Sequence, residues 1–353
     1  MIERALLINP FGIGDVVLSM ALVEALKKNI PSVRVGFLGN ERTVALLRMN
    51  ASIDVCHEFN RDELRALRRK SPVAYLKRVR AYFREWKAER YDTCFDLSLG
   101  REFAFMAFLA GIGRRVGFNY KNRGWFLSHP TPLIAYERQH VTDWQLSLLN
   151  SVGLRALPVS AVLPLKIPDS AEQRASQILE STGHSHFLAL APGGGRSWGP
   201  DASYKQWSPD RFSAVANRVS IPGVFVLLVG DPEEEDLLKK VAQGLSVPSI
   251  LVSGESLPVV AALLKRSRFL LCNDGGLLHL ANALGVKTVS IFGPVDEKVY
   301  GPYGKDTEHE VVVEEVSCRP CYRNFHFPAC AHRRRCQEEL SVEKVLAAVR
   351  KIS

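Results

Sequence analysis

The sequence alternates short apolar runs with amphipathic helical patterns, and this alternation stops once and then restarts. In the first half, strands are expected at 5–9, 33–38, 53–57, 91–99 and 115–118. In the second half, strands are expected at 187–191, 224–229, 249–252, 269–273 and 288–292. Strands that alternate with helices form parallel sheets covered by helices on both faces. The pattern therefore predicts an α/β protein with two such sheets.

The break between the two series lies at 153–170, where one glycine and three prolines leave little periodicity. A chain of 353 residues is also longer than one domain of usual size. We expect an N-terminal domain at 1–165, a C-terminal domain at 166–340, and a C-terminal helix at 341–353 that can return to the N-terminal domain. Two Rossmann-like, doubly wound domains are expected to face a central cleft, where open α/β sheets bind ligands.

The net charge of +9 lies entirely in the N-terminal half. Residues 1–165 hold 24 Lys and Arg against 15 Asp and Glu, whereas residues 166–353 hold 22 of each. The stretch 61–90 alone holds 11 basic and 4 acidic side chains. Such a surface favours an anionic partner, which can be nucleic acid, anionic lipid or an acidic substrate. The aromatic residues of this stretch either graze an anionic membrane or, as the helical spacing favours, face the core: Tyr75, Tyr82, Phe83 and Trp86.

No apolar stretch approaches the ~20 residues that a membrane-spanning helix needs. The longest candidate, Phe103–Gly113, has about half that length. The apolar run 1–9 ends at Pro10 and lacks the basic start of a signal peptide. We therefore expect a cytoplasmic protein, with peripheral contact at the inner face of the cytoplasmic membrane as its link to lipid.

The first motif is the loop from Asn9 to Asp15, which follows the first expected strand and contains Gly12 and Gly14. Glycines here let the backbone turn tightly beside a ligand. A dinucleotide fingerprint needs a third glycine where Val17 stands, so the loop is weak evidence for NAD. Asp15 is equally well explained as a helix cap and as a catalytic carboxylate.

The second motif is a glycine-rich loop after the first strand of the second half. Gly193, Gly194, Gly195 and Arg196 are followed by Lys205, and glycines beside cations suit a phosphate group. No Gly-Lys-Ser/Thr follows, so this is not a Walker A loop. The alternative is a flexible surface loop.

The third motif is Asp274-Gly275-Gly276-x-x-His279, where a strand ends and a helix begins within two residues. The backbone N–H groups of Gly275 and Gly276 are then available at a helix N-terminus, which favours a diphosphate. His279 lies about one turn further along the helix, so we expect it to contact the same ligand.

The motifs in this order resemble glycosyltransferase family 9, the heptosyltransferase family of lipopolysaccharide core synthesis, over nearly the whole chain. The residues that carry the resemblance are Gly14-Asp15, Lys205-x-Trp207-x-Pro209, Gly230-x-Pro232-x-Glu234, Asp274-Gly275-Gly276-x-x-His279 and Gly293-Pro294. The resemblance implies a GT-B fold of two Rossmann-like domains. It also implies an inverting sugar transfer that requires no cofactor, with the acceptor on the N-terminal domain and the nucleotide-sugar on the C-terminal domain.

Carried over to this sequence, the resemblance implies that Asp15 is the general base and that Lys205 neutralises the leaving diphosphate. Glu234 would bind the nucleoside. The residues implied in donor binding are Gly193, Gly194, Gly195, Arg196, Lys205, Glu234, Asp274, Gly275, Gly276 and His279, and those beside the acceptor are Gly12 and Gly14. The expected partners are ADP-heptose as donor and an acidic lipopolysaccharide-type or lipid-linked glycan as acceptor, with no nucleic acid.

Four cysteines fall within 19 residues near the C-terminus: Cys318, Cys321, Cys330 and Cys336. Four thiolates can hold Zn or Fe in tetrahedral geometry, so the cluster is a candidate structural metal site. Reduced thiols or a disulfide are the alternatives. The adjacent arginines at 333–335 predict lowered pKa values for these thiols.

Three other functions remain open from the residues alone. A GT-B-like sugar-nucleotide epimerase would use the same diphosphate loops. An NAD-dependent oxidoreductase would need a fuller glycine fingerprint. A nucleic-acid-binding protein is suggested by the isoelectric point of about 9.2, and would place stacking aromatics among its basic residues.

Overall fold

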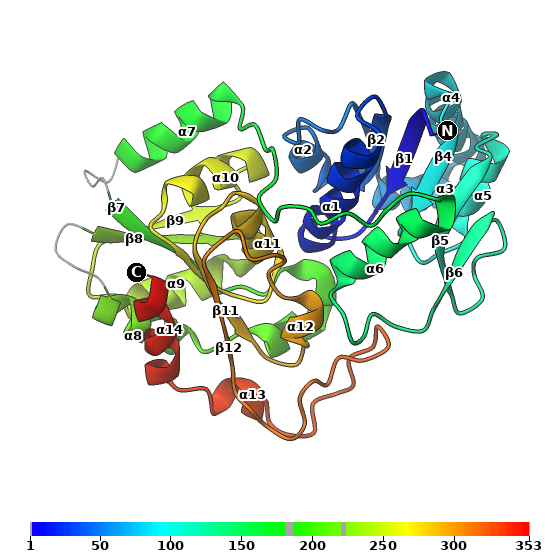
Figure 1. The fold of residues 1–353 in the computed structure, drawn as a ribbon. Coiled ribbons are helices and arrows are strands. Elements are labelled where there is room, and N and C mark those ends of the chain that lie inside the picture. The colour runs from blue at the N-terminus through cyan, green and yellow to red at the C-terminus, as the bar shows by residue number, and fades with distance from the viewer. Residues whose placement is uncertain (1, 181–185, 220–223, 353) are drawn as a thin grey trace. The chain divides into compact units, whose positions relative to one another are not determined.

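The computed structural model describes residues 2–180, 186–219 and 224–352, and the chain forms two compact units, Met1–Val159 and Ser160–Ser353. The boundary falls inside the linker expected at 153–170. Each unit is an α/β domain built on a six-stranded parallel sheet, so the predicted fold class is confirmed (Figure 1).

Unit 1 has the strand order β3-β2-β1-β4-β5-β6, with every neighbouring pair parallel. The strands are β1 (Arg4–Ile8), β2 (Arg34–Asn40), β3 (Val55–Phe59), β4 (Thr93–Asp96), β5 (Arg114–Tyr120) and β6 (His129–Leu133). This is the order of a Rossmann sheet, in which the strand order reverses between β1 and β4 while all strands stay parallel. The carboxyl ends of β1 and β4 therefore define the ligand edge of unit 1.

The helices of unit 1 follow the predicted alternation. They are α1 (Ile13–Asn29), α2 (Val44–Leu47), α3 (Arg61–Lys70), α4 (Pro72–Glu89), α5 (Glu102–Leu109), α6 (Val141–Ser147) and the 3-10 helix η1 (Leu148–Val152). The basic stretch breaks where expected, because Ser71 caps α4 by accepting a hydrogen bond from the Ala74 N–H at 3.3 Å. Tyr82 and Trp86 are each 1% exposed, so these aromatics face the core.

Unit 2 repeats the same path, with the order β12-β11-β10-β7-β8-β9 and parallel pairing throughout. Its strands are β7 (His186–Ala191), β8 (Val224–Gly230), β9 (Ser249–Ser253), β10 (Leu270–Asn273), β11 (Thr288–Phe292) and β12 (His309–Val313). Its helices are α7 (Asp169–Glu180), η2 (Arg196–Lys205), α8 (Pro209–Val219), η3 (Pro232–Glu234), α9 (Glu235–Gln243), α10 (Leu257–Arg266), α11 (Gly276–Ala283), α12 (Glu297–Tyr300), α13 (Arg335–Glu338) and α14 (Val342–Ile352). The ligand edge of unit 2 lies where β7 and β10 end.

The C-terminal helix α14 belongs to unit 2. Val345 and Val349 are fully buried in the same core as Trp207, whose indole N–H donates to the Leu340 carbonyl at 3.1 Å. The helix packs on α8, β11 and β12. The possibility that it returns to the N-terminal domain was wrong, because the apolar face of α14 completes the core of its own unit.

Throughout the described ranges, no helix combines the length and apolar character needed to cross a bilayer.

Candidate functional site in unit 2 and the acidic loop of unit 1

The glycine-rich loop after β7 wraps around the carboxylate of Glu234. The backbone N–H of Gly195 donates to Glu234 Oε1 at 3.2 Å, and the N–H of Asp231 donates to Oε2 at 3.0 Å. A Cβ at Gly193 would overlap this carboxylate, so a side chain cannot be placed there without displacing Glu234. The glycine-rich loop and the turn that carries Glu234, which are 39 residues apart in the sequence, therefore pack together.

The predicted cation of the site, Lys205, is buried against the third motif. Its Nζ lies 2.7 Å from Asp274 Oδ2, and both side chains are 7% exposed. The same ammonium lies 5.1 Å from the centre of the Trp198 ring, a cation–π distance. A buried ion pair such as this one holds a positive charge in place where water screens it little.

Asn273 joins the two glycine turns, a role that sequence reasoning missed. Its amide Nδ2 donates to the Pro192 carbonyl at 2.7 Å, and its Oδ1 accepts from the Trp207 N–H at 3.1 Å. A Cβ on Gly275 would lie 3.6 Å from the carbonyl of Gly194, so the two turns are in close approach. The position of an asparagine at the end of a strand was the only sequence signal.

Helix α11 begins at Gly276 directly beside these turns. Its N-cap residue Gly275 supplies no side-chain hydrogen bond to the first turn. The N-terminal N–H groups of a helix favour an anion, both as donors and through the helix dipole. His279 lies on the same helix and is 6% exposed. Of the other predicted donor residues, Arg196 begins η2, but its side chain lies outside the described part.

The cysteine-rich segment packs against the same loops. Arg319 donates to the carbonyls of Gly293 at 2.5 Å and Val295 at 3.1 Å, and the Gln337 amide donates to the Lys205 carbonyl at 3.1 Å. The Trp198 ring, on the glycine-rich side, lies 5.1 Å from the Tyr322 ring. The segment therefore supports the loop that carries Lys205, which sequence reasoning did not foresee.

The cysteines themselves are free thiols. Within the described ranges, no three or more His, Cys, Asp or Glu side chains are grouped so as to hold a metal ion, so the structural Zn or Fe suggested for Cys318, Cys321, Cys330 and Cys336 is unsupported. For Cys336 and Cys321 the prediction of a lowered thiol pKa was wrong. Burial raises the pKa of Cys336 to about 11, and it raises the pKa of Cys321 as well.

In unit 1, two buried asparagines fix the loop between β1 and α1. Asn9 Nδ2 donates to the Asp15 carbonyl at 3.0 Å, and Asn40 Nδ2 donates to the carbonyls of Pro10 at 3.1 Å and Phe11 at 2.6 Å. These amides are 1% and 6% exposed. They stand at the ends of β1 and β2, and they hold the loop in one conformation.

Asp15 is the third residue of α1, and its side chain is exposed. Its Oδ2 accepts from the Gly12 N–H at 3.3 Å, which is a capping contact. Burial raises the pKa of Tyr136, and the charge of Asp15 adds to this effect, so the carboxylate lies within electrostatic reach of that phenol. The geometry thus includes the cap that the sequence suggested, and it leaves the carboxylate accessible.

A second acid at the ligand edge of unit 1 was not predicted. Asp96 ends β4 in register with Ile8, next to the Asp15 loop. Burial raises the pKa of this carboxyl to about 6, although the Ser98 N–H donates to it at 2.9 Å. Its place at the end of an apolar strand was a weak signal, because such residues commonly only cap turns.

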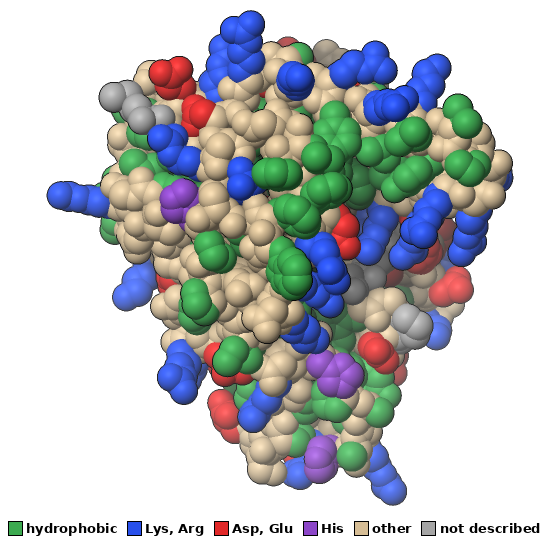
Figure 2. All heavy atoms as spheres, turned by 90° about the vertical axis from the view of Figure 1, so that its right-hand side faces the viewer, with side chains coloured by type: hydrophobic (Ala, Val, Ile, Leu, Met, Phe, Trp, Pro, Cys, Tyr) green, Lys and Arg blue, Asp and Glu red, His purple; other side chains and the backbone are tan. Residues whose placement is uncertain are grey.

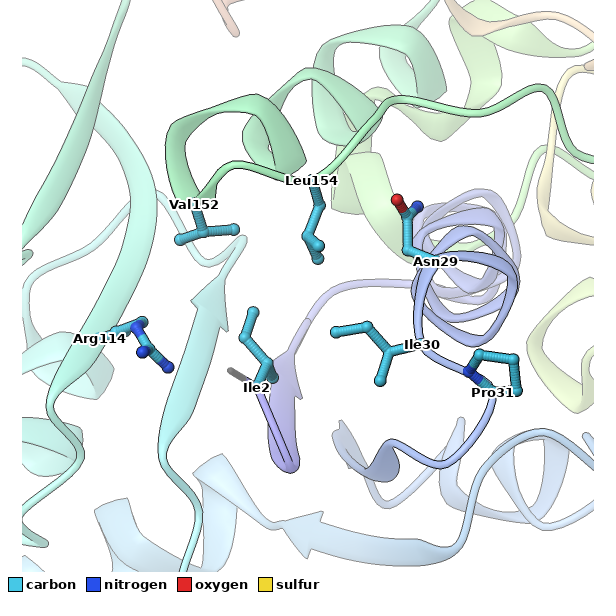
Figure 3. A pocket seen from close by; sticks show the side chains of 7 residues that line it. All are labelled: Ile2, Asn29, Ile30, Pro31, Arg114, Val152 and Leu154. Atoms are coloured by element: carbon cyan, nitrogen blue, oxygen red, sulfur yellow. The ribbon is translucent and has the colours of Figure 1, made fainter.

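A pocket of about 420 Å³ lies in unit 1, but it is not this edge. Figure 3 shows it between the start of β1 and the end of α1, lined by Ile2, Asn29, Ile30, Pro31, Arg114, Val152 and Leu154. Asp15 lies at the other end of the 17-residue helix α1. The lining is mainly apolar and includes none of the predicted site residues.

Comparison with known proteins agrees with this architecture. The chain is 22% identical to lipopolysaccharide heptosyltransferase 3 of Escherichia coli over 83% of its length and 84% of that protein. Its structure superposes on that of a family 9 glycosyltransferase from Veillonella parvula DSM 2008 with a TM-score of 0.81 at 20% identity. The superposition covers 99% of this chain and 97% of the other chain. The corresponding values for E. coli ADP-heptose lps heptosyltransferase II are 99% and 98%, a TM-score of 0.78 and 17% identity.

The two Rossmann-like units have the GT-B fold, and the family match places the chain among glycosyltransferases. A family model matches residues 79–327, and the chain belongs to glycosyltransferase family 9 (heptosyltransferase). The alternatives left open by the sequence, an epimerase, an NAD-dependent oxidoreductase and a nucleic-acid-binding protein, find no support in these comparisons.

Proposed function

We propose that the protein transfers heptose from ADP-heptose to an acidic acceptor of the lipopolysaccharide core, with inversion at the anomeric carbon. The observation that carries the proposal is the Lys205–Asp274 pair at 2.7 Å beside the uncapped N-terminus of α11, in a chain of the heptosyltransferase family. A related E. coli structure is named for ADP-heptose.

The donor's diphosphate would lie at the turn of Gly275 and Gly276, opposite the glycine-rich loop of Gly193–Gly195. Lys205 and the helix N-terminus would stabilise the charge that develops on the diphosphate as the sugar leaves. Glu234 accepts two backbone N–H groups, and a carboxylate has further lone pairs that would accept a ribose hydroxyl.

Asp15 would act as the general base. The acceptor hydroxyl oxygen forms a bond to the anomeric carbon as the bond from that carbon to the phosphate oxygen breaks. ADP leaves with the electron pair, and the hydroxyl proton passes to Asp15. Its side chain is exposed, so an acceptor hydroxyl can reach the carboxylate.

The acceptor would bind to unit 1 beside Gly12 and Gly14. The excess of 24 basic over 15 acidic side chains in residues 1–165 suits an acceptor with phosphate and acidic sugar groups. The diphosphate charge is met by protein groups, so transfer should proceed equally well with a strong chelator present.

The test combines product analysis with one conservative variant. Mass spectrometry should detect addition of one heptose to heptose-deficient lipopolysaccharide with ADP-heptose, and no addition from UDP- or GDP-sugars. Asp15→Asn keeps the contact with the Gly12 N–H but cannot take the proton, so transfer should fall by about 10²–10⁴-fold. ADP should still raise the melting temperature of this variant.

Asp62→Asn is a matched control, because Asp62 is also an exposed acid in the first turn of a helix. It should transfer at the wild-type rate. Wild-type turnover by Asp15→Asn would remove Asp15 as the base, and addition of a different sugar would contradict the proposed donor.

A further inference from the structure

One helix of unit 1 exposes apolar side chains that the core does not use. Seven of the eight residues of α5 are apolar. Phe103, Ala104 and Ala107 are buried, whereas Phe108 and Leu109 are 51% and 54% exposed. A helix that only covers a sheet needs a single apolar stripe, so the second apolar face of α5 requires its own explanation.

The loop between β5 and β6 extends this face. The Phe126 ring lies 4.7 Å from the Phe105 ring and 6.0 Å from the Phe108 ring. The neighbouring Trp125 is 82% exposed. The guanidinium of Arg115 holds the loop in place by donating to the Phe126 carbonyl at 2.6 Å. We call Phe105, Phe108, Leu109, Trp125 and Phe126 the α5 patch.

Cations surround the α5 patch. Residues 97–128 contain five Lys and Arg and one acidic residue, Glu102. Lys121 and Arg123 are exposed, and they lie 5.0 and 5.8 Å from the centre of the Tyr120 ring. The Arg115 guanidinium lies 5.3 Å from the centre of the Phe108 ring. Figure 2 shows hydrophobic side chains gathered on this side of the molecule, with Lys and Arg side chains around them.

We propose that the α5 patch docks unit 1 onto an anionic lipid bilayer. The exposed Trp, Phe and Leu side chains enter the boundary between headgroups and acyl chains, where amphipathic aromatic rings are favoured. The surrounding Lys and Arg side chains bind the headgroup phosphates, and the 11 cations of residues 61–90 add attraction at longer range. The positive charge of the Lys and Arg side chains around the α5 patch favours anionic lipid over other partners.

This proposal changes the residues expected at the membrane. The sequence offered membrane contact by the aromatics of 61–90 as the less favoured alternative to a place in the core, and Tyr82 and Trp86, each 1% exposed, belong to the core. The docking surface is the next helix and the loop after β5. The proposal does not rest on the sugar donor or the acceptor, so the two can fail separately.

The test is sedimentation of the full chain with vesicles of phosphatidylcholine alone or mixed with phosphatidylglycerol. Binding should require the anionic lipid and should weaken in high salt. The double variant Phe108→Ser/Leu109→Ser should lower the partition coefficient by about tenfold, because two exposed apolar groups no longer enter the interface. Lys121→Glu/Arg123→Glu should lower it by a similar factor.

Val162→Ser is the matched apolar control, since Val162 is 39% exposed in unit 2, and it should bind vesicles as the wild type does. Vesicles should also shift the tryptophan emission of the wild type to the blue. Trp125→Phe should keep binding but lose most of that shift, because Trp125 is 82% exposed whereas Trp86 and Trp207 are buried and Trp144 and Trp198 are half-buried.

Unchanged vesicle binding by the correctly folded Phe108→Ser/Leu109→Ser variant would overturn the proposal. So would a dimer in size-exclusion chromatography that this variant dissociates, because the patch would then be an interface between two copies. Circular dichroism and thermal melting establish that each variant is folded.

Discussion

The two units share one strand order but place opposite chemistry at the edge where ligands bind. In unit 2 the edge holds a buried ion pair, Lys205 with Asp274, and two glycine turns in close approach. In unit 1 the edge holds an exposed carboxylate, Asp15, on a loop fixed by Asn9 and Asn40. The same strand order thus carries a buried ion pair in one unit and an exposed carboxylate in the other. The chemistry at the edge is therefore decided by the loops rather than by the fold.

This difference between a buried ion pair and an exposed carboxylate predicts how substitutions at each edge change the stability of the fold. Removing one member of a buried ion pair leaves an unpaired charge in the interior and is strongly destabilising. Changing an exposed carboxylate usually has little effect on stability. Variants at the edge of unit 2 should therefore alter activity and stability together, whereas Asp15 variants should alter activity alone.

The largest expected effect on activity and stability together is that of Lys205→Met. We expect transfer to fall by about 10²–10³-fold, because the departing diphosphate loses its cation. We also expect the free energy of unfolding to fall by about 3–5 kcal/mol, because Asp274 stays buried without its partner. Chemical denaturation and steady-state kinetics measure the two effects.

The double variant Lys205→Met/Asp274→Asn separates these effects. It should recover most of the stability, since no charge remains unpaired, but not the transfer. If Lys205→Met proves as stable as Asp15→Asn, the contrast between the two edges is wrong.

A smaller, pH-dependent effect is expected at Asp96. Its folded pKa is about 6, above the usual 3.8, because burial disfavours the carboxylate. The folded state then retains a proton that the unfolded state has released, so stability falls as pH rises from about 4 to 6. Asp96→Asn removes this penalty. The variant should match the wild type at low pH and should be more stable above pH 6 by about 2–3 kcal/mol.

Thermal or urea unfolding of both proteins across this pH range measures the difference, with Asp62→Asn as an exposed control that should show none of it. A difference that does not change with pH would show that Asp96 is ionised in the folded protein.

The smallest effect is expected for His279→Ala. Loss of a side chain beside the α11 N-terminus should weaken ADP binding by about tenfold, as measured by calorimetry. His57→Ala is a matched control, because His57 is a buried histidine of unit 1 and should not affect ADP. An unchanged dissociation constant for His279→Ala would exclude His279 from the donor site.

The sequence predicted most of the sheets, and its misses have physical reasons. Five strands of unit 2 were located because they are apolar runs bounded by turn residues. The strand β6 was missed because its sequence, HPTPL, contains two prolines. Prolines are tolerated there because β6 is an edge strand and its N–H groups need not all pair. The strand β12, which is an edge strand of unit 2, was missed too.

The sequence also identified which segments of the proposed donor site would meet, but not how. The glycine loop, Glu234 and the Gly275 turn came from motif spacing together with the family resemblance, and the structure brings them together. The ion pair between Lys205 and Asp274 joins residues 69 positions apart, and no local pattern encodes that contact. The exposed face of α5 could not be predicted from the sequence either. A helix that is almost entirely apolar has the same pattern as a buried helix until its neighbours are known.

The ion pair of unit 2 has a consequence for ligand exchange. In the unliganded protein Lys205 already has a carboxylate as counter-ion, so an arriving anion replaces a bond rather than satisfying a bare cation. An anion with a single weak charge gains little free energy by replacing Asp274 at Lys205. A group with several charged oxygens can bind the lysine and the N-terminus of α11 at the same time. In the reaction proposed above, Asp274 would pair with the lysine again after the products depart, which would make the release of the spent nucleotide easier than the strength of a buried cation alone would suggest.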